Sequence, residues 1–272
     1  MPKKIPLFYW SSVLFENRPA ENYGDLLSQY IVEQVSGLST VFYNAPKKRK
    51  SWFKKRHLLA IGSIMNYATA KSVVWGSGII KRNDQVGGAR FLAVRGPQSR
   101  KRVLELGYSC PKVYGDPGLL LPKFYNPQIE KQYELGVIPH YIDYALAQET
   151  FSTSKDTSVI DLIGDDLFAT TDEILKCKRV ISSSLHGLII AHAYGIPAVW
   201  VRFSDKLTGD NVKFQDYFES VGLHPYSGID LNKNESLTDI DRLFDQFPVL
   251  PDAARLQALS SELVSAFPSD WK

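Results

Sequence analysis

The chain has 272 residues, of which 44% are hydrophobic and 22% are charged, an ordinary composition for a globular protein with one large domain or two smaller ones. Its formal net charge of +3 is too small to indicate nucleic-acid binding, although it suits an anionic substrate. The two cysteines, Cys110 and Cys177, are far apart and lack the spacing of a zinc site or a disulfide framework, so we expect free thiols and a cytoplasmic protein.

The first half of the chain alternates strand and helix patterns. Short apolar runs that end in small or polar residues predict strands at residues 5–10, 41–44, 57–61, 72–75, 91–95 and 112–114. The Asn22-Tyr23-Gly24-Asp25 segment leads into a helix with an apolar stripe, and Gly96-Pro97 opens a second helix that Gly107 closes. Residues 122–132 contain proline and asparagine without periodicity, which indicates a linker.

The alternation restarts after the linker. Strands are predicted at residues 135–139, 159–162 and on both sides of a helix at residues 185–194. Further helices are expected from residue 141 and at residues 172–177 and 214–221. A last amphipathic helix is expected from residue 250, with an apolar stripe that ends at Phe267. The pattern predicts an α/β fold of two Rossmann-like domains facing a cleft, at residues 1–125 and 133–272, with the last helix packing across both.

The most informative segment is Ser182-Ser183-Ser184-Leu185-His186-Gly187, which lies where a predicted strand meets a predicted helix. In open α/β sheets, ligands bind at this junction, beyond the carboxyl end of a strand. Free backbone N–H groups and the helix dipole favour an anion there, and the serine hydroxyls add donors. His186 places a titratable group in the first helical turn, so the segment predicts an anion site with a proton donor.

Other small, polar or charged residues also follow predicted strands or begin predicted helices, and these ends share one rim in an α/β fold. They are Asn22, Gly24, Asp25, Ser63, Ser77, Arg95, Asp116 and His140. Arg95 ends an apolar strand, where its planar guanidinium needs water or a partner, and it would suit a carboxylate or phosphate. Lys213 follows the last strand of the second half and could line the anion site.

Taken together, these motifs resemble the polysaccharide pyruvyl transferase family. The serine-rich segment followed by Gly195-Ile196-Pro197 looks like the family's C-terminal signature. Asn22-Tyr23-Gly24-Asp25 resembles its N-terminal motif, and Val94-Arg95-Gly96-Pro97 followed by Asp116-Pro117 resembles its central motif. The resemblance covers roughly residues 22–222. One departure is Ser184, because many members carry arginine before the Leu-His pair; Arg95, Lys213 or another cation would have to replace that guanidinium.

The resemblance implies a fold similar to B-type glycosyltransferases and transfer of a pyruvyl group from phosphoenolpyruvate to two hydroxyls of a sugar, forming a ketal. The acceptor would be a surface polysaccharide, an exopolysaccharide or a lipid-linked precursor. No metal or cofactor beyond the co-substrate is expected, a peripheral contact with the inner membrane is left open, and so is the oligomeric state. His186 is the expected general acid, and Asp25, Asp116 and His140 are candidate bases. The expected substrate-binding residues are Asn22, Gly24, Ser63, Ser77, Arg95, Asp116, Ser183, Ser184, Leu185, Gly187 and Lys213.

Two other functions remain open at this level. A nucleotide-sugar-dependent glycosyltransferase of the same architecture would also place a diphosphate at a helix N-terminus, with Asp205 or Asp210 near the ribose. A non-catalytic glycan-binding subunit would bind the sugar and tolerate loss of His186. Preference for phosphoenolpyruvate over a nucleoside diphosphate sugar separates the enzyme hypotheses.

Overall fold

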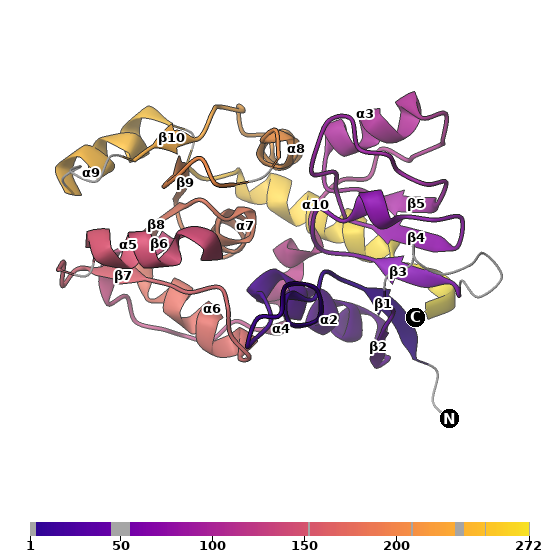
Figure 1. Cartoon of the computed structure of the whole chain (residues 1–272), viewed down its shortest axis with the longest axis horizontal. Coiled ribbons are helices and arrows are strands. Elements are labelled where there is room, and N and C mark those ends of the chain that lie inside the picture. The colour runs from indigo at the N-terminus through magenta and orange to yellow at the C-terminus, as the bar shows by residue number, and fades with distance from the viewer. Residues whose placement is uncertain are drawn as a thin grey trace.

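The computed structural model describes residues 4–44, 55–151, 153–207, 209–231, 237–247 and 249–271, and it contains two parallel sheets of five strands each. The sheets lie at opposite ends of the molecule, and the helix α10 (Ala253–Ala266) runs between them (Figure 1). The fold is therefore α/β, as the alternating patterns predict. Parts of the predicted domains, namely residues 1–3, 45–54 and 272 together with shorter internal gaps, lie outside the described residues.

The two sheets share one strand order. The first contains β1 (Ile5–Phe8), β2 (Thr40–Phe42), β3 (His57–Leu59), β4 (Ser72–Trp75) and β5 (Arg90–Ala93), in the order β2-β1-β3-β4-β5. The second contains β6 (Tyr133–Ile138), β7 (Thr157–Val159), β8 (Cys177–Ser182), β9 (Ala198–Arg202) and β10 (Ile229–Asp230), in the order β7-β6-β8-β9-β10. In each sheet the second strand lies on one side of the first strand, and the later strands are added on its other side. This change creates a topological switch point between β1 and β3 and another between β6 and β8.

Helices connect the strands. They are α1 (Ser12–Glu16), α2 (Tyr23–Ser36), α3 (Pro97–Glu105), α4 (Leu121–Phe124), α5 (Tyr144–Phe151), α6 (Leu167–Leu175), α7 (Leu185–Ala193), α8 (Val212–Val221), α9 (Leu237–Gln246) and α10, with 3₁₀ turns η3 (Met65–Tyr67), η4 (Pro117–Leu120), η5 (Tyr141–Asp143) and η6 (Ser269–Trp271). The ends of α2 follow from its sequence: Asn22 accepts from the backbone N–H of Gly24 at 3.0 Å, and Gly37 ends the helix at a φ of 67°. Within the described ranges, no helix combines the length and the apolar character needed to cross a membrane.

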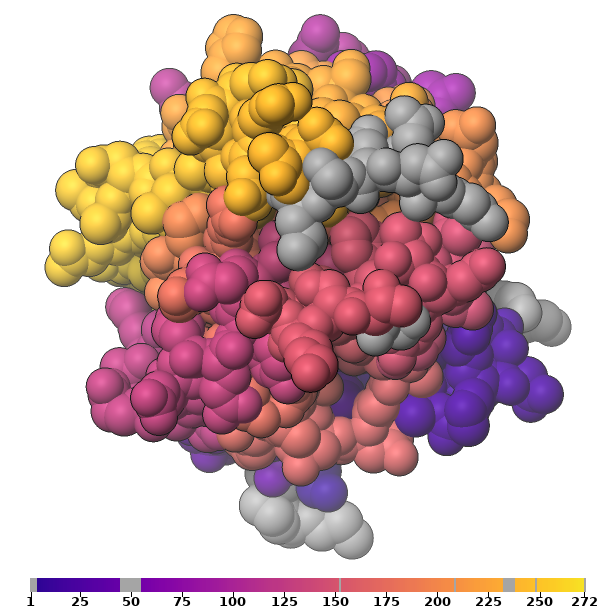
Figure 2. Space-filling view, turned by 90° about the vertical axis from the view of Figure 1, so that its left-hand side faces the viewer, coloured from indigo at the N-terminus to yellow at the C-terminus, as the bar shows by residue number. Residues whose placement is uncertain are grey.

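A smaller hydrophobic cluster, which includes Val137 and Ile181, lies in the second half, and a large one extends through both halves. The large cluster includes Leu7 and Val74 of the first sheet, Leu188 of α7 and Leu259 of α10, all of them buried. The α10 backbone is also tied to the first sheet, because Trp75 donates its indole N–H to the carbonyl of Leu263 at 2.8 Å. Seen from the side of the second sheet, second-half segments form most of the surface, with the indigo N-terminal region and the yellow C-terminal helix at its edges (Figure 2).

Several predicted elements differ in the structure. Residues 112–114 form no strand; one isolated bridge joins Val94 to Tyr114. The start of the predicted linker, and the leucines before it, are helical instead, because Asp116 caps η4 and three consecutive leucines are buried there. The helix predicted at residues 172–177 is α6, which begins earlier because Asp166 accepts from two backbone N–H groups of its first turn.

Candidate functional site

A pocket of about 350 Å³ lies between the two sheets and is lined by segments that follow the carboxyl ends of their strands. Its walls come from the segments after β1, β3, β6 and β8 and from the first turns of α2 and α8, with further residues from nearby loops. The lining residues are Trp10, Ser12, Glu16, Asn22, Asp25, Gly62, Ser63, Ile64, Asn66, Tyr67, Ile80, His140, Tyr141, Ile142, Ser184, Leu185, His186, Leu207 and Lys213. Both topological switch points therefore open onto one pocket, which is where such sheets bind ligands.

The serine-rich turn after β8 supports this pocket mainly from behind. The fully buried hydroxyl of Ser182 bonds with the carbonyl of Ile138 at 2.7 Å and accepts from the N–H of Ser184 at 3.0 Å. The Ser183 hydroxyl accepts from the N–H of His140 at 2.8 Å and does not line the pocket. These bonds fix the ends of β6 and β8 relative to each other, and Ser184, the N-cap residue of α7, is left at the pocket surface.

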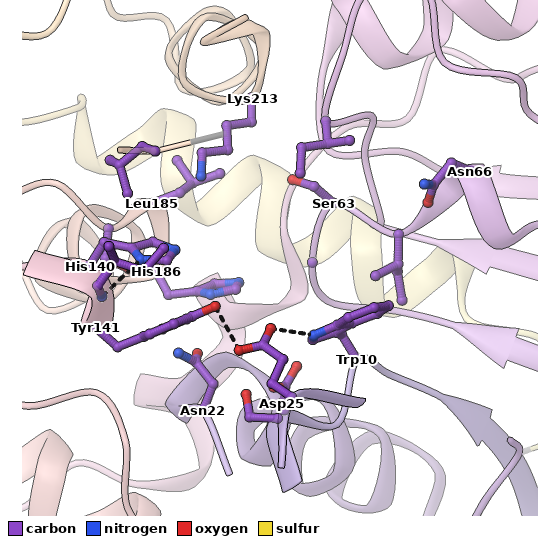
Figure 3. Close-up of a pocket in the computed structure, with 18 of the residues that line it drawn as sticks. Trp10, Asn22, Asp25, Ser63, Asn66, His140, Tyr141, Leu185, His186 and Lys213 are labelled. Atoms are coloured by element: carbon purple, nitrogen blue, oxygen red, sulfur yellow. Dashed lines mark hydrogen bonds between the residues drawn. The ribbon is translucent and has the colours of Figure 1, made fainter. Parts of the chain in front are cut away.

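His186 lies in the first turn of α7 and faces the pocket (Figure 3). Its Nε2 atom is buried and has no hydrogen-bond partner among the described residues. The ring lies so close to α2 that a Cβ atom at Gly24 would be 2.2 Å from Nδ1. Gly24 therefore makes room for the imidazole and does not itself line the pocket. Gly187 plays a similar part, since a Cβ there would be 2.4 Å from the Ser182 hydroxyl oxygen.

Both pocket histidines are neutral at neutral pH. Burial, followed by the charges of Lys213 and Arg95, lowers the pKa of His186 to about 3. Burial and Lys213 lower the pKa of His140 to about 3 as well. The Nδ1 atom of His140 accepts from the backbone N–H of Ile142 at 3.4 Å, which leaves the proton of the neutral ring on Nε2. His140 is thus arranged as a hydrogen-bond donor.

Lys213 supplies a cation to the pocket. It lies in the first turn of α8, and its side chain points toward Leu185 at the start of α7 (Figure 3). No carboxylate of the described residues forms an ion pair with it. Burial, and then the charge of Arg95, lowers the pKa of Lys213 to about 8, so its ammonium form predominates at neutral pH and is available to an anion.

Arg95, in contrast, does not line the pocket. It is fully buried and donates to Asp216 at 3.0 Å, to the Ser63 hydroxyl at 2.6 Å and to the carbonyl of Ile79 at 2.7 Å. Asp216 belongs to α8 and also accepts from the hydroxyl of Ser99 at 2.6 Å. The protein itself satisfies the guanidinium, and Arg95 positions Ser63, which does line the pocket.

Asn22 and Asp25 enter the pocket from the start of α2 (Figure 3). Burial, and then the charges of Glu21 and Glu16, raises the pKa of Asp25 well above its usual range. A hydrogen bond from Ser12 opposes the shift without cancelling it. Asp25 therefore holds its proton more tightly than an ordinary aspartate, whereas the two histidines hold theirs less tightly.

Two further predicted residues lie behind the pocket wall. Ser77 is buried and donates to the carbonyl of Gly62 at 2.8 Å, which supports the turn after β3. Asp116 accepts from the N–H of Gly118 at 2.9 Å, and burial raises its pKa to about 6. Neither lines the pocket, because both are engaged in holding loops of the first half.

Sequence reasoning missed one wall of the pocket. Glu16 accepts from the Trp10 indole N–H at 2.8 Å and from the Tyr141 hydroxyl at 2.8 Å, so it joins the two halves. Trp10 follows the first strand, and the strand-end rule that selected the other residues applies to it equally. The link from Glu16 to Tyr141 spans more than a hundred positions and has no local signal in a single sequence. No cluster of metal-ligating side chains was found within the described ranges.

Comparison with known proteins agrees with the motifs. The profile of the polysaccharide pyruvyl transferase family matches residues 22–205. The chain belongs to this family. It is also 34% identical over 222 residues to the uncharacterized protein L143 of Acanthamoeba polyphaga mimivirus, covering 77% of this chain and 76% of that protein.

The family match covers only part of the residues that line the pocket. It includes the predicted motifs at Asn22, Arg95 and His186, and it ends before α8. Lys213, the free cation of the pocket, lies beyond the matched residues of this pyruvyl transferase. It contributes a positive charge to the same pocket as Ser184.

Proposed function

We propose that this pyruvyl transferase moves a pyruvyl group from phosphoenolpyruvate onto two hydroxyls of a sugar, forming a ketal and releasing phosphate. The observation that carries the proposal is the free Lys213 ammonium beside the start of α7, in a pocket that also contains His186 and Asp25. The Lys213 ammonium and the N-terminus of α7 favour binding of an anion, and His186 and Asp25 could serve as the proton donor and acceptor that the reaction needs. The acceptor is a surface polysaccharide, an exopolysaccharide or its lipid-linked precursor.

The donor would bind on the side of the second half. Lys213 and the N–H groups at the start of α7 would contact its phosphate or carboxylate, with His140 donating a hydrogen bond from Nε2. In this arrangement Lys213 replaces the guanidinium that many relatives carry at the position of Ser184. The two halves would close around the donor as in B-type glycosyltransferases, with the pocket as the base of the cleft.

The reaction needs one proton donor and one proton acceptor. In the first step a sugar hydroxyl attacks C2 of phosphoenolpyruvate, its proton passes to a base, and C3 receives a proton to become a methyl group. In the second step another hydroxyl attacks C2, the bond to the phosphate oxygen breaks, and the hydroxyl proton leaves with phosphate. We assign the C3 proton to His186, whose pKa rises when the anionic donor arrives, and the acceptor side to Asp25, whose raised pKa makes its carboxylate a stronger base than that of an ordinary aspartate.

Phosphate release from phosphoenolpyruvate in the presence of a panel of oligosaccharides and lipid-linked sugars tests this function. Release that depends on an acceptor and falls at least about a hundredfold in His186→Ala is the expected result. His224→Ala removes an exposed histidine that does not line the pocket and serves as the control. Absence of both turnover and phosphoenolpyruvate binding, combined with binding of a nucleoside diphosphate sugar, would favour the glycosyltransferase alternative.

A further inference from the structure

The pocket wall opposite the histidines is not used by the donor-binding arrangement proposed above. Trp10 and Asn66 lie on this side in Figure 3, across the pocket from His140 and His186. They come from the segments that follow β1 and β3, and Tyr67 lines the pocket beside them. None of these residues is cationic, so the wall offers nothing that an anionic donor requires.

Trp10 presents a fixed, flat surface. Its indole N–H is already satisfied by Glu16 at 2.8 Å, and its ring packs against Phe15 and Tyr67 at centroid distances of 4.7 and 5.7 Å. The side chain is nevertheless only partly buried, and it lines the pocket. What Trp10 can offer a ligand is therefore the apolar surface of its ring, held in one orientation.

Asn66 adds an unsatisfied acceptor. Its Oδ1 atom is buried and has no hydrogen-bond partner among the described residues, although the residue lines the pocket. A buried acceptor without a partner costs free energy that a donated hydrogen bond would recover. The missing partner must carry an O–H or N–H group and must approach from the pocket side.

The charge of the wall limits the ligand further. Burial alone would raise the pKa of Glu16, but hydrogen bonds from Trp10, Tyr141 and Arg18 together lower it, which keeps the carboxylate charged beside the indole. A charged carboxylate repels phosphate and carboxylate groups, and it attracts hydroxyl donors. A neutral polyol with one apolar C–H face satisfies all three observations: the flat ring, the orphan acceptor and the negative charge.

We infer that Trp10, Asn66 and Glu16 form the acceptor subsite, in which the C–H face of a pyranose ring stacks on the Trp10 indole and a sugar hydroxyl donates to Asn66 Oδ1. The inference rests on the proposed function, since it names the residues that would recognise the acceptor of that reaction. The sugar stacked on Trp10 would present its neighbouring hydroxyls toward the donor side of the pocket.

Direct binding tests this subsite without turnover. Saturation-transfer NMR is recorded with the methyl pyranosides of glucose, galactose and mannose and with lactose and cellobiose, on the full chain. We expect binding of at least one glycoside, about tenfold weaker in Trp10→Ala and largely retained in Trp10→Phe, which keeps a flat ring. Asn66→Ala should also weaken binding, and circular dichroism identifies any variant that fails to fold.

Phe168→Ala is the matched control. Phe168 is a partly exposed aromatic residue that packs against Tyr30 and Tyr125 and lines a different cavity. Its loss should leave glycoside binding unchanged. The assignment would be overturned if no glycoside in the panel bound. Glycoside affinities of Trp10→Ala and Asn66→Ala equal to that of Trp10→Phe would also overturn it, and so would binding of uridine in place of glycosides.

The subsite and the reaction can fail separately. Where acceptor-dependent phosphate release is found, Trp10→Ala and Asn66→Ala should raise the KM of the acceptor and leave the KM of phosphoenolpyruvate unchanged. Unchanged acceptor KM in both variants would reject the subsite and leave pyruvyl transfer intact. Glycoside binding that depends on Trp10, without any phosphate release, would support the subsite and count against the transfer reaction.

Discussion

His186 is neutral in the structure because burial and two nearby cations disfavour its imidazolium form. The same side chain is the donor of the C3 proton in the proposed reaction. These statements are compatible only when the substrate changes the balance of charge around the ring. A phosphate and a carboxylate next to Lys213 would do so, since they compensate the charges that lower the pKa of His186.

Phosphoenolpyruvate binding should therefore be accompanied by proton uptake at His186. The pKa of His186 is about 3 in the free site and is higher in the complex. A proton is therefore taken up on binding at pH values between these two pKa values, and the affinity for phosphoenolpyruvate increases as the pH falls through the pKa of the complex. Calorimetry at pH 6 in buffers of different ionisation enthalpy measures the number of protons bound. We expect a smaller uptake in His186→Gln than in the wild type; equal uptake in both would assign the proton to another group.

Lys213 should determine the alkaline limit of donor binding. Its pKa of about 8 in the free site means that the ammonium group loses its proton as pH rises past that value, and anion affinity falls with it. We expect the KM of phosphoenolpyruvate to rise above pH 8 in the wild type. Lys213→Met should raise the KM at all pH values and remove this dependence, whereas Lys213→Arg should extend tight binding to higher pH. A wild-type KM that is constant through this range would contradict the assignment.

At the scale of elements, α8 connects the chemistry of the second half to the framework of the first. Lys213 faces the pocket, and one turn later Asp216 is buried against Arg95 and Ser99. A Cβ atom at Gly96 would lie 1.9 Å from the carbonyl oxygen of Asp216, so the glycine permits this close approach. The position of the pocket cation thus depends on a buried ion pair.

Replacing Arg95 by methionine should destabilise the protein by about 3–5 kcal/mol, because Asp216 would be left as an unpaired buried charge. Urea unfolding measures the change. Arg242→Met removes an exposed pair with Asp239 and should change the free energy of unfolding by less than about 1 kcal/mol. Equal effects of the two substitutions would show that the buried pair is not needed to hold α8.

The sequence predicts elements well where local signals are strong. α2, α3 and α7 lie close to their predicted positions because a capping asparagine, an N1 proline and terminal glycines mark their ends. α9 was not predicted, and the strand at residues 112–114 was wrong because a short apolar run does not specify whether neighbouring strands will pair with it.

For the site, the strand-end rule found the pocket residues that follow β3, β6 and β8, including Ser63, His140 and His186. It could not separate residues that face the pocket from those that support it. Arg95 and Ser183 have the right residue types at the right strand ends, yet their partners lie in distant segments. Such contacts depend on how the two halves pack, which a single sequence does not contain.

At the scale of the whole molecule, the shared core predicts cooperative unfolding. Leu259 and Leu263 of α10 are fully buried in the core cluster that also contains strands of the first sheet and helices of the second half. Calorimetry should give one transition, with calorimetric and van't Hoff enthalpies that agree. Leu259→Ala should lower the free energy of unfolding by about 2–5 kcal/mol without splitting that transition. Two separated transitions in the wild type would mean that the halves unfold independently.

The return of α10 to the first sheet also bears on how the protein is made. Trp75 bonds to Leu263 and packs edge-on against Phe267, and Arg56 pairs with Asp270, so segments that are far apart in the sequence together complete one half (Figure 1). During translation the first sheet emerges from the ribosome early, whereas α10 emerges after the second sheet. The half that is synthesised first is therefore completed last. Until α10 packs against it, the apolar surface of the first half around Trp75 is exposed and can bind chaperones.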